Sequence, residues 1–457
     1  MIQNKLKATI AGASGFVGLN LSKKISNLYQ IRGLSRKQRD KGIDENISWS
    51  RADLFSFQST NDALKDTDIA IYLVHSMLPS SRLFQGSFQD TDLFIAHNFA
   101  SACVQNNVKQ IIYVGGLVPE VDSSPHLESR KEVEELLKNC GIPTTILRAG
   151  MVVGDGGSSF EILKNLVINL PLMVLPKWTR STTQAIYIDD LVHVISTSIN
   201  DNKFFDRTIN VVNGESLTYR KLIEDASKYF STKKILLPIP INYTSFSKLW
   251  VKIFGQADYE LVSPLIDSLK CNLPDDKSSL EVDRLVKYKT FEQMLQQVSK
   301  EKTKKYKQRK NKVYLKENTV RSIQRLSNPN HLSPLRICDL YMEWLPLYLK
   351  KIVRVNSEDD KLIFKFLWFR KPLLILQRIN TINEIDRIKL HIVGGLLTKT
   401  KDTGWLEFRQ VSGGKYTLAS INEFIPSLPW YIYCYTQAVI HLIVMKRFNS
   451  FLKNLKQ

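Results

Sequence analysis

Cysteine is scarce in this chain of 457 residues, which contains five: Cys103, Cys140, Cys271, Cys338 and Cys434. No two of them have the close spacing that zinc sites and disulfide frameworks need, so we expect neither a metal site nor a disulfide scaffold. No signal-peptide pattern precedes the first apolar run either. These absences together favour a protein that folds in the reducing cytoplasm.

Long hydrophobic runs are also missing. The best candidate, residues 431–445, is shorter than the roughly 20 apolar residues that cross a bilayer, and it contains Gln437 and His441. We therefore interpret residues 430–452 as one long, aromatic-rich core helix. Its last turns carry Lys446, Arg447 and Lys453, so peripheral contact with the inner face of the membrane stays open as an alternative.

Acidic residues are fewer than basic ones, 44 against 64, which gives a formal net charge of +20. Much of the excess lies in a run at residues 300–312. Such a run could bind nucleic acid or an anionic membrane, but no aromatic-rich platform for stacking bases accompanies it. We favour a solvated linker and expect no specific nucleic-acid binding.

Glycine marks the start of the chain. Residues 6–11 form an apolar run typical of a buried strand, and residues 16–28 have apolar positions near helical spacing. The glycines between them suit a first βα unit, in which they permit a tight turn, the close approach of a pyrophosphate and helix-to-strand packing. The unpaired N–H groups of the helix start then attract phosphate. We expect a dinucleotide to contact Gly12, Ser14, Gly15, Phe16, Val17 and Gly18.

The second expected strand, residues 30–36, ends in Arg36 and contains no acidic residue. An acidic residue at this place binds the ribose hydroxyl of NAD, whereas a basic residue accommodates the 2′-phosphate of NADP. The sequence therefore predicts NADP(H) as the preferred cofactor, with NAD(H) as the alternative.

The third strand, residues 47–54, ends in Asp53 and Leu54, which we expect beside the cofactor. Alternatively, Asp53 caps the turn that follows it. Residues 68–74 form a near-continuous apolar run, typical of a strand buried on both faces of a parallel sheet. Ligands of such sheets bind at the carboxyl ends of the strands. The last residue of this run and the two that follow it are therefore expected to border the cofactor: Val74, His75 and Ser76.

Strand and helix patterns continue to alternate to about residue 150, which predicts a doubly wound parallel sheet of the α/β class. Further along, Trp178 and Arg180 are either substrate contacts or a core tryptophan and a surface arginine. Residues 209–218 are expected to form the last strand and then the start of a helix, with Thr218 as a candidate N-cap. Residues 235–255 are expected to form a helix entry that packs over the substrate mouth.

These features resemble the atypical short-chain dehydrogenase/reductases, the NmrA-like or extended group. The resemblance rests on the three glycines, on Ala-Asp-Leu at residues 52–54, on the apolar fourth strand and on Leu-Arg-Ala-Gly at residues 147–150. It is closer to a bacterial subgroup with a Leu-Val-His-Ser-Met run, here residues 73–77, and a His-Leu-x-x-Arg run, here residues 126–130. It covers residues 1–285 well and implies a Rossmann domain with a separate C-terminal domain.

The catalytic positions that the resemblance implies are altered in this chain. The parent family uses Tyr-x-x-x-Lys and an upstream serine. In this chain His126 occupies the position of the tyrosine and Arg130 that of the lysine, and glycines 115 and 116 occupy the place of the serine. The spacing of four keeps both side chains on one helix face. A nearby cation favours a neutral imidazole, which can still donate a hydrogen bond to a developing oxyanion.

His126 could therefore act for the tyrosine, Arg130 could hold the ribose, and Ser76 or His75 could replace the serine. The alternative is that His126 only starts the helix and no hydride is transferred. Nucleotide-sugar epimerase chemistry is less favoured because it depends on the missing tyrosine.

The C-terminal part has a different sequence pattern. Four segments typical of antiparallel strands precede the terminal helix: residues 362–369, 388–397, 404–409 and 416–421. This order resembles the helix-grip domains, which suggests a lipid- or quinone-like ligand. The predicted domains are an NAD(P)-binding domain at residues 1–299, with substrate-side helices from about residue 155, a basic linker at 300–330 and an α+β domain at 331–457.

Two functions stay open. The first is NADP(H)-dependent reduction of a carbonyl or enone in a small apolar substrate. The second is a non-catalytic NADP(H)-binding redox sensor or accessory protein, similar to the NmrA proteins or to an accessory subunit of respiratory complex I.

Overall fold

The computed structural model describes residues 5–37, 39, 47–75, 81–119, 123–232, 234–239, 266–274, 286–300, 318–379, 386–399 and 403–455. By their contacts the residues divide into two compact units. Unit 1 comprises residues 1–77 and 95–306, and unit 2 comprises residues 78–94 and 307–457. The basic run lies outside the described ranges from residue 301 onward.

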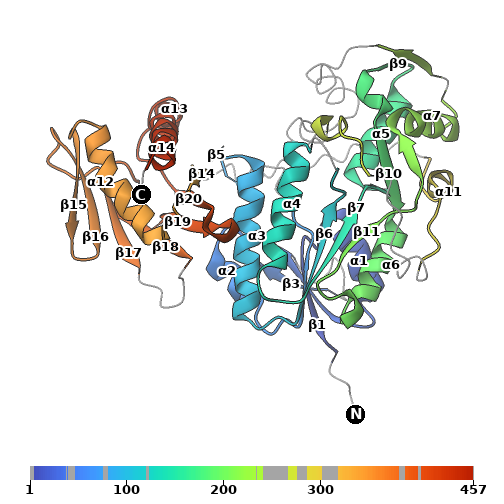
Figure 1. Cartoon of the computed structure of the whole chain (residues 1–457), viewed down its shortest axis with the longest axis horizontal. Helices are drawn as coiled ribbons and strands as arrows, with labels where there is room; N and C mark the ends of the chain where they lie inside the picture. Colours follow the sequence, from blue (N-terminus) through green and yellow to red (C-terminus); the bar gives the residue numbers. More distant parts are fainter. Residues whose placement is uncertain are drawn as a thin grey trace. The chain divides into compact units, whose positions relative to one another are not determined.

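Unit 1 is built on a seven-stranded parallel sheet with the order β11-β7-β6-β4-β1-β2-β3 (Figure 1). The chain winds outward from β1 in both directions, so the predicted doubly wound α/β fold is confirmed. The strands are β1 (Lys7–Ala11), β2 (Gln30–Ser35), β3 (Ile47–Arg51), β4 (Ile69–Tyr72), β6 (Gln110–Gly116), β7 (Thr144–Ala149) and β11 (Thr208–Val211).

Helices bury apolar side chains against both faces of this sheet. Successive residues of a strand point to opposite faces, and in β1 Ile10 packs into one buried cluster while Ala11 packs into the other. The first cluster includes residues of α1 and α6, and the second includes residues of α2, α3 and α4. These helices are α1 (Phe16–Ile25), α2 (Phe57–Ala63), α3 (Phe88–Gln105), α4 (Pro125–Lys138) and α6 (Ile188–Ser198).

Two small sheets complete unit 1, with the orders β12-β10-β8 and β13-β9. Along the chain, the strands of these two sheets alternate with helices. The elements are β8 (Met151–Val153), α5 (Ser158–Asn169), β9 (Leu172–Leu175), η2 (Lys177–Arg180), β10 (Thr182–Tyr187), η3 (Asn202–Phe204), β12 (Ser216–Thr218), α7 (Tyr219–Tyr229), β13 (Ile235–Pro238) and α11 (Phe291–Gln296).

Two local predictions in this region are wrong. Residues 209–218 do not form one strand, because Gly214 adopts φ +74° and separates β11 from β12, which belongs to another sheet. The predicted helix start is confirmed, since Thr218 is the N-cap of α7. Ile235–Pro238 is a strand paired with β9 rather than a helix entry, since its backbone N–H and C=O groups complete a parallel ladder. Residues 240–255 of the expected helix entry lie outside the described ranges.

Unit 2 contains an eight-stranded sheet of order β15-β16-β17-β18-β19-β20-β14-β5, with a helix before and after the main strands. The predicted antiparallel sheet with a terminal helix is confirmed. Its elements are β5 (Leu83–Gln85), β14 (Val320–Ser327), α12 (Pro334–Tyr348), β15 (Val353–Glu358), β16 (Lys361–Phe366), β17 (Leu374–Ile379), β18 (Arg387–Gly394), β19 (Trp405–Val411), η4 (Ser412–Gly414), β20 (Tyr416–Phe424), α13 (Trp430–Tyr435) and α14 (Gln437–Lys453).

Two features of unit 2 differ from the sequence expectation. Strand β5 comes from the segment between β4 and α3 and pairs in parallel with β14, with Leu83 opposite Val320. The terminal helix is two helices, because Thr436, at φ −122° and ψ −85°, leaves helical geometry between α13 and α14. Among the described residues no helix is long and apolar enough to span a bilayer.

One face of the unit 2 sheet is apolar and the other holds buried polar groups. Phe408 of β19 packs with Tyr341 of α12 and Phe448 of α14. On the opposite face of β19, Glu407 accepts a hydrogen bond from Arg409 Nε at 2.7 Å, and both side chains are about 1% exposed. The guanidinium of Arg409 also lies 4.1 Å from the ring centre of Phe94, at the unit 2 end of α3.

Candidate functional site

The glycine turn after β1 has no room for side chains at two of its positions. Gly12 adopts φ +91°, and a Cβ there would lie 3.0 Å from the backbone of Leu73. A Cβ at Gly18 would lie 2.3 Å from the carbonyl oxygen of Gly12. The turn is therefore packed as tightly as the sequence predicted, between the ends of β1 and β4 and the first turn of α1.

The N-terminus of α1 suits an anion. Gly15 is the N-cap, no side chain caps the helix, and its first turn contains no acidic residue. Ser14 and Gly15 are exposed. Backbone N–H groups and the positive end of the helix dipole are thus available to a phosphate, which is the chemistry that a dinucleotide pyrophosphate requires.

Phe16 has a packing partner within unit 1. Its ring lies where side chains at Gly154 and Gly157 would stand, since a Cβ at either glycine would approach the ring to 2.8 Å. The loop after β8 therefore closes over the first turn of α1 through this ring. Val17 is half-buried and packs against the main core.

The end of β2 presents basic residues. Arg36 is exposed directly after the strand, and the backbone N–H of Lys37 donates to Ser35 Oγ at 3.3 Å. Arg39 stacks over Trp49 of β3, with its guanidinium carbon 4.6 Å from the ring centre. Exposed cationic side chains therefore lie at the strand end where a 2′-phosphate is expected.

Asp53 has a structural partner in the turn before α2. Its Oδ1 accepts a hydrogen bond from the backbone N–H of Phe55 at 3.2 Å, and its own N–H donates to Ser59 Oγ at 3.1 Å. This is the turn-capping role that the sequence analysis gave as the alternative. The neighbouring carbonyl of Leu54 accepts from Asn98 Nδ2 of α3 at 2.7 Å.

The end of β4 brings His75 to His126. Val74 and His75 follow β4 and are half-buried, and Ser76 lies outside the described residues. His126 is 8% exposed near the start of α4, and the two imidazole rings have centres 4.8 Å apart at an angle of 46°. The sequence placed each histidine at the site separately, and the structure places their rings in contact.

The start of α4 is fixed by its cap. Ser124 Oγ accepts from the N–H of Leu127 at 3.3 Å, and Pro125 occupies the first helical turn. Both residues are favoured at helix starts, because serine satisfies an otherwise unpaired N–H and proline has none to satisfy. His126 is thereby held on the first turn, where backbone N–H groups are abundant.

Arg130 lies over the end of β6. A Cβ at Gly116 would lie 4.0 Å from Arg130 Cγ, so the stem of the arginine passes the glycine closely. The Tyr113 hydroxyl donates to the Arg130 carbonyl oxygen at 3.3 Å. The Tyr113 ring also fills the space beside Gly115, where a Cβ would come within 2.9 Å of Cε1.

The sequence analysis missed Tyr113. Its only signal was an aromatic residue two positions before a glycine on a buried strand, a pattern that does not reveal which way a ring turns. The ring explains why residue 115 is glycine, and it leaves Gly116 as the position with room for a side chain, since the nearest atom would be Leu127 Cδ2 at 3.5 Å.

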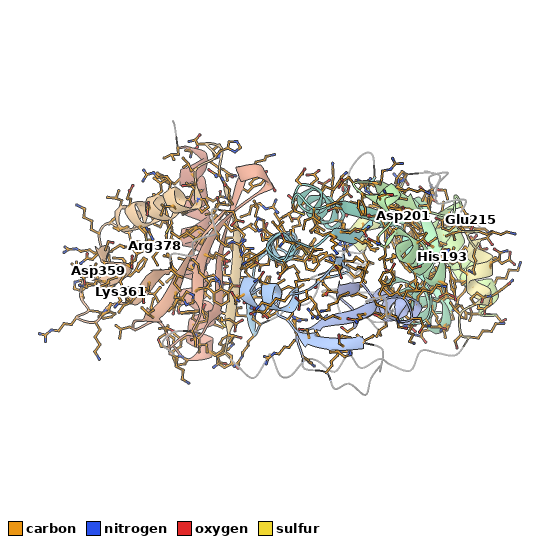
Figure 2. The ribbon with its side chains drawn as sticks, turned by 90° about the horizontal axis from the view of Figure 1, so that it is seen from below. His193, Asp201, Glu215, Asp359, Lys361 and Arg378 are labelled. Atoms are coloured by element: carbon orange, nitrogen blue, oxygen red, sulfur yellow. The ribbon has the colours of Figure 1, made fainter. Side chains whose placement is uncertain are left out.

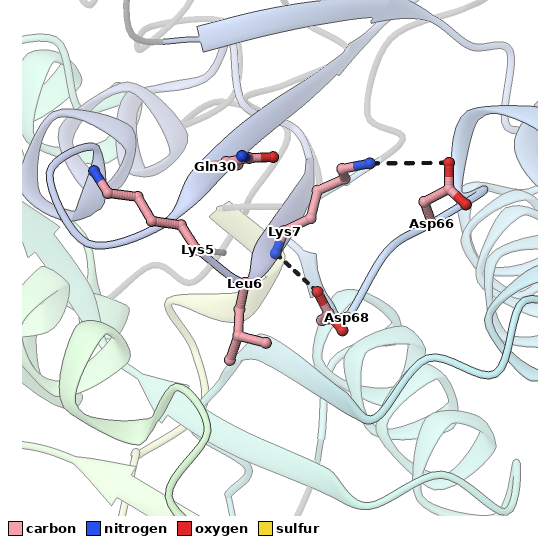
Figure 3. Close-up of a pocket in the computed structure, with 6 residues that line it drawn as sticks. All are labelled: Lys5, Leu6, Lys7, Gln30, Asp66 and Asp68. Atoms are coloured by element: carbon pink, nitrogen blue, oxygen red, sulfur yellow. Dashed lines mark hydrogen bonds and ion pairs between the residues drawn. The ribbon is translucent and has the colours of Figure 1, made fainter. Parts of the chain in front are cut away.

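Other candidates are separate from this edge of the sheet or have packing roles. Trp178 is buried, with its ring 6.0 Å from that of Tyr219, and Arg180 is exposed. Figure 3 shows an open hollow of about 340 Å³ lined by Lys5, Leu6, Lys7, Gln30, Asp66 and Asp68. It lies at the amino end of β1, opposite the glycine turn, and ligands of parallel sheets bind at the carboxyl ends of strands. No cluster of metal-ligating side chains occurs among the described residues.

A protein-family model described as NAD(P)H-binding matches residues 12–166. Unit 1 therefore contains an NAD(P)-binding domain of the Rossmann type. The match begins at the first glycine of the turn and includes β2, the histidine pair and Arg130.

One curated relative matches part of the chain. The auxiliary protein GraX of Staphylococcus aureus (strain NCTC 8325 / PS 47) is 31% identical over 113 residues, which is 24% of this chain and 37% of that protein. The chain thus spans little more than a third of the length of this relative.

Solved structures support the fold. A nucleoside-diphosphate-sugar epimerase from Staphylococcus aureus superposes with a TM-score of 0.51 at 16% identity, over 64% of this chain and 100% of the epimerase. An epimerase from Methanothermobacter thermautotrophicus gives a TM-score of 0.49 at 12% identity, over 64% and 91% of the two chains. At such identities the first of these likenesses establishes the fold of unit 1 and nothing about its substrate.

Proposed function

We propose that the chain binds NADP(H) and reduces a carbonyl or enone group in a small apolar substrate. The observation that carries this proposal is the contact between His75 and His126 at the carboxyl edge of the sheet. Both rings lie at strand and helix ends that border the glycine turn, where a nicotinamide ring and a substrate oxygen would meet.

In this proposal the bound dinucleotide supplies the hydride. His126 would donate a hydrogen bond to the substrate oxygen as negative charge develops there, and its ring proton, replaced afterwards from water, would pass to that oxygen to complete the reduction. His75 orients the His126 ring through their contact. Arg130, one turn further along α4, holds the ribose, and Ser76 stands in for the family's serine.

Cofactor preference is proposed from the end of β2. An exposed arginine that pairs with a phosphate forms charge-assisted hydrogen bonds, worth about 1.5–3 kcal/mol, or roughly 10- to 150-fold in affinity. Arg36 is therefore proposed to discriminate NADP(H) from NAD(H), which has a hydroxyl at that place.

The cofactor part is tested by calorimetric titration of NADPH, NADP, NADH and NAD into the purified chain. Arg36→Ala is expected to weaken NADPH binding at least tenfold and to change NADH binding less than threefold. Lys24→Ala, an exposed cation on the last turn of α1, is the matched control and should change neither. Equal loss of both cofactors in Arg36→Ala, or binding of NADH as tight as that of NADPH, would contradict the preference.

The catalytic part is tested by NADPH oxidation with a panel of apolar aldehydes, ketones and enones. His126→Ala is expected to lower kcat at least 100-fold with little change in NADPH affinity, because general acid–base and hydrogen-bond donors contribute about 10²–10⁴ in rate. Full activity in His126→Ala would remove that residue from the mechanism.

A second candidate is an NADP(H)-binding sensor or accessory protein without catalysis. It is favoured by Tyr113, which occupies the space where a serine at residue 115 would stand, and by the partial match to an auxiliary protein. This function requires arginine-dependent NADPH binding with no substrate-dependent oxidation across the panel. The lipid- or quinone-like ligand of unit 2 is proposed as the apolar substrate in the first case and as the sensed molecule in the second.

A further inference from the structure

Large apolar side chains are exposed at one end of the sheet of unit 2. The turn between β16 and β17 presents Leu367, Trp368 and Phe369 in succession, with exposed fractions of 50%, 70% and 53%. Single exposed apolar residues are ordinary on protein surfaces, but contiguous groups mark interaction sites. The rings of Trp368 and Phe369 contact that of Phe366, with ring centres 5.2 and 5.0 Å apart, and still leave more than half of each side chain exposed.

Two neighbouring segments extend this group. The N–H of Leu367 donates to the carbonyl of Ile352 at 2.9 Å, which places the hairpin beside the end of α12, where Leu347 is 67% exposed. The N–H of Leu396 donates to the carbonyl of Pro372 at 3.0 Å, so the exposed Leu396 joins from the turn after β18. We name residues 347–352, 367–373 and 395–399 the apolar tip.

The apolar tip has charge of one sign. It contains no Asp or Glu, and its basic residues are all exposed: Lys350, Lys351, Arg370, Lys371 and Lys399. The other end of the same sheet differs, because the β15–β16 turn there carries Glu358, Asp359 and Asp360; Figure 2 labels Asp359 beside Lys361 and Arg378. Acidic and basic side chains are therefore mixed at that end of the sheet, whereas the apolar tip carries basic ones alone.

Aromatic side chains are also exposed at the same end of unit 2. The N–H of Ser427 donates to the carbonyl of Leu397 at 3.0 Å, and α13 begins three residues later. Tyr431 and Tyr435 of α13 are 78% and 79% exposed. Tyrosine and tryptophan have an apolar body and a polar edge, so both are stable at the level of lipid headgroups.

We propose that the apolar tip binds the surface of an anionic lipid bilayer. The aromatic and aliphatic side chains enter the headgroup region, and the surrounding lysines and arginines neutralise lipid phosphates, the combination typical of interfacial binding. A protein partner is a poorer fit, because lysine is depleted at protein–protein interfaces and here lysines surround the apolar residues. The proposal does not depend on the function of unit 1.

The test is co-sedimentation of the full chain with vesicles of 70% phosphatidylcholine and 30% phosphatidylglycerol, in 0.1 M NaCl. We expect binding that phosphatidylcholine vesicles do not show and that 0.5 M NaCl weakens. The double variant Trp368→Ser/Phe369→Ser should weaken binding at least tenfold. The variant Lys350→Gln/Lys351→Gln should weaken it about 25-fold, since each basic residue near an anionic surface contributes roughly fivefold.

Matched controls come from elsewhere in the chain. Lys361→Gln/Lys415→Gln removes two exposed charges from the opposite end of the sheet, and Leu28→Ser removes an exposed apolar residue from unit 1; both should bind vesicles normally. A circular dichroism spectrum and a urea unfolding midpoint equal to those of the unsubstituted chain show that each variant is folded. The proposal is overturned by absence of binding to the anionic vesicles, by equal binding of the tip variants, or by a dimer in sedimentation velocity that Trp368→Ser/Phe369→Ser dissociates.

Discussion

The two glycines at the end of β6 permit a matched comparison of packing. Gly115 and Gly116 are adjacent on one strand and pair with Arg148 and Ala149 of β7. A Cβ at residue 115 would lie 2.9 Å from Cε1 of Tyr113, whereas the nearest atom to a Cβ at residue 116 would be 3.5 Å away. The same substitution should therefore have opposite consequences at neighbouring positions.

The Tyr113 ring cannot move aside cheaply. It is fully buried, its centre lies 6.0 Å from that of Tyr72, and its hydroxyl donates to the Arg130 carbonyl. Overpacking at such a site costs about 1–3 kcal/mol. Replacing a glycine inside a strand recovers roughly 0.5–1 kcal/mol of chain entropy at either position. We expect Gly115→Ser to lose about 1–2 kcal/mol of unfolding free energy and Gly116→Ser to be unchanged or slightly more stable.

Urea unfolding followed by circular dichroism measures the difference, and hydrogen exchange of the β6 amides locates it within unit 1. The double variant Gly115→Ser/Tyr113→Ala, compared with Tyr113→Ala alone, completes a double-mutant cycle. Without the ring, the serine should no longer lower the free energy of unfolding. Equal stability of Gly115→Ser and Gly116→Ser, or a penalty at residue 115 that survives loss of the ring, would refute the packing argument.

Two further predictions concern charges. Glu407→Gln should cost unit 2 about 3–5 kcal/mol, because it leaves the buried Arg409 charge uncompensated, whereas replacing both by leucine should cost less than Glu407→Gln alone. Urea unfolding followed by circular dichroism measures both variants, and the opposite order would contradict this account. At the amino end of β1, burial raises the pKa of Asp68, but hydrogen bonds from Lys109 and from the N–H of Lys7 outweigh it and hold that pKa below its usual range. A carboxyl pKa that is lower in the folded than in the unfolded state stabilises the fold above the unfolded value, and this contribution is lost as pH falls through the folded value. Asp68→Asn should therefore cost about 1 kcal/mol at pH 7 and progressively less as pH falls below the usual range of an aspartate; a pH-independent cost would show that the charge is not involved.

Local sequence patterns were sufficient to predict much of the fold of unit 1. A buried strand, a glycine turn and an amphipathic helix in succession predict one another, because each constrains the backbone within a few residues. The positive φ of Gly12 and the close approach at Gly18 are properties of that local turn, and the continuous apolar run of β4 is typical of a strand buried on both faces.

The direction in which a side chain points was harder to predict from the sequence. The spacing of His126 and Arg130 places them on one helix face, but the contact of His126 with His75 depends on how α4 lies against the end of β4. Asp53 illustrates the same limit, since a residue at a strand end faces a ligand or its own turn according to hydrogen bonds that form only in the folded chain.

Apolar periodicity and glycine placement act over short distances, so local patterns were sufficient to predict a nucleotide-binding α/β unit followed by an antiparallel sheet and a helix. The folded structure was needed to show that β5, from the segment between β4 and α3, joins the sheet of unit 2 beside β14. It also decided that the hairpin and helix ends of that unit gather into one basic apolar tip. Both depend on pairing between residues far apart in the chain, for which a short strand such as Leu83–Gln85 carries no local signal.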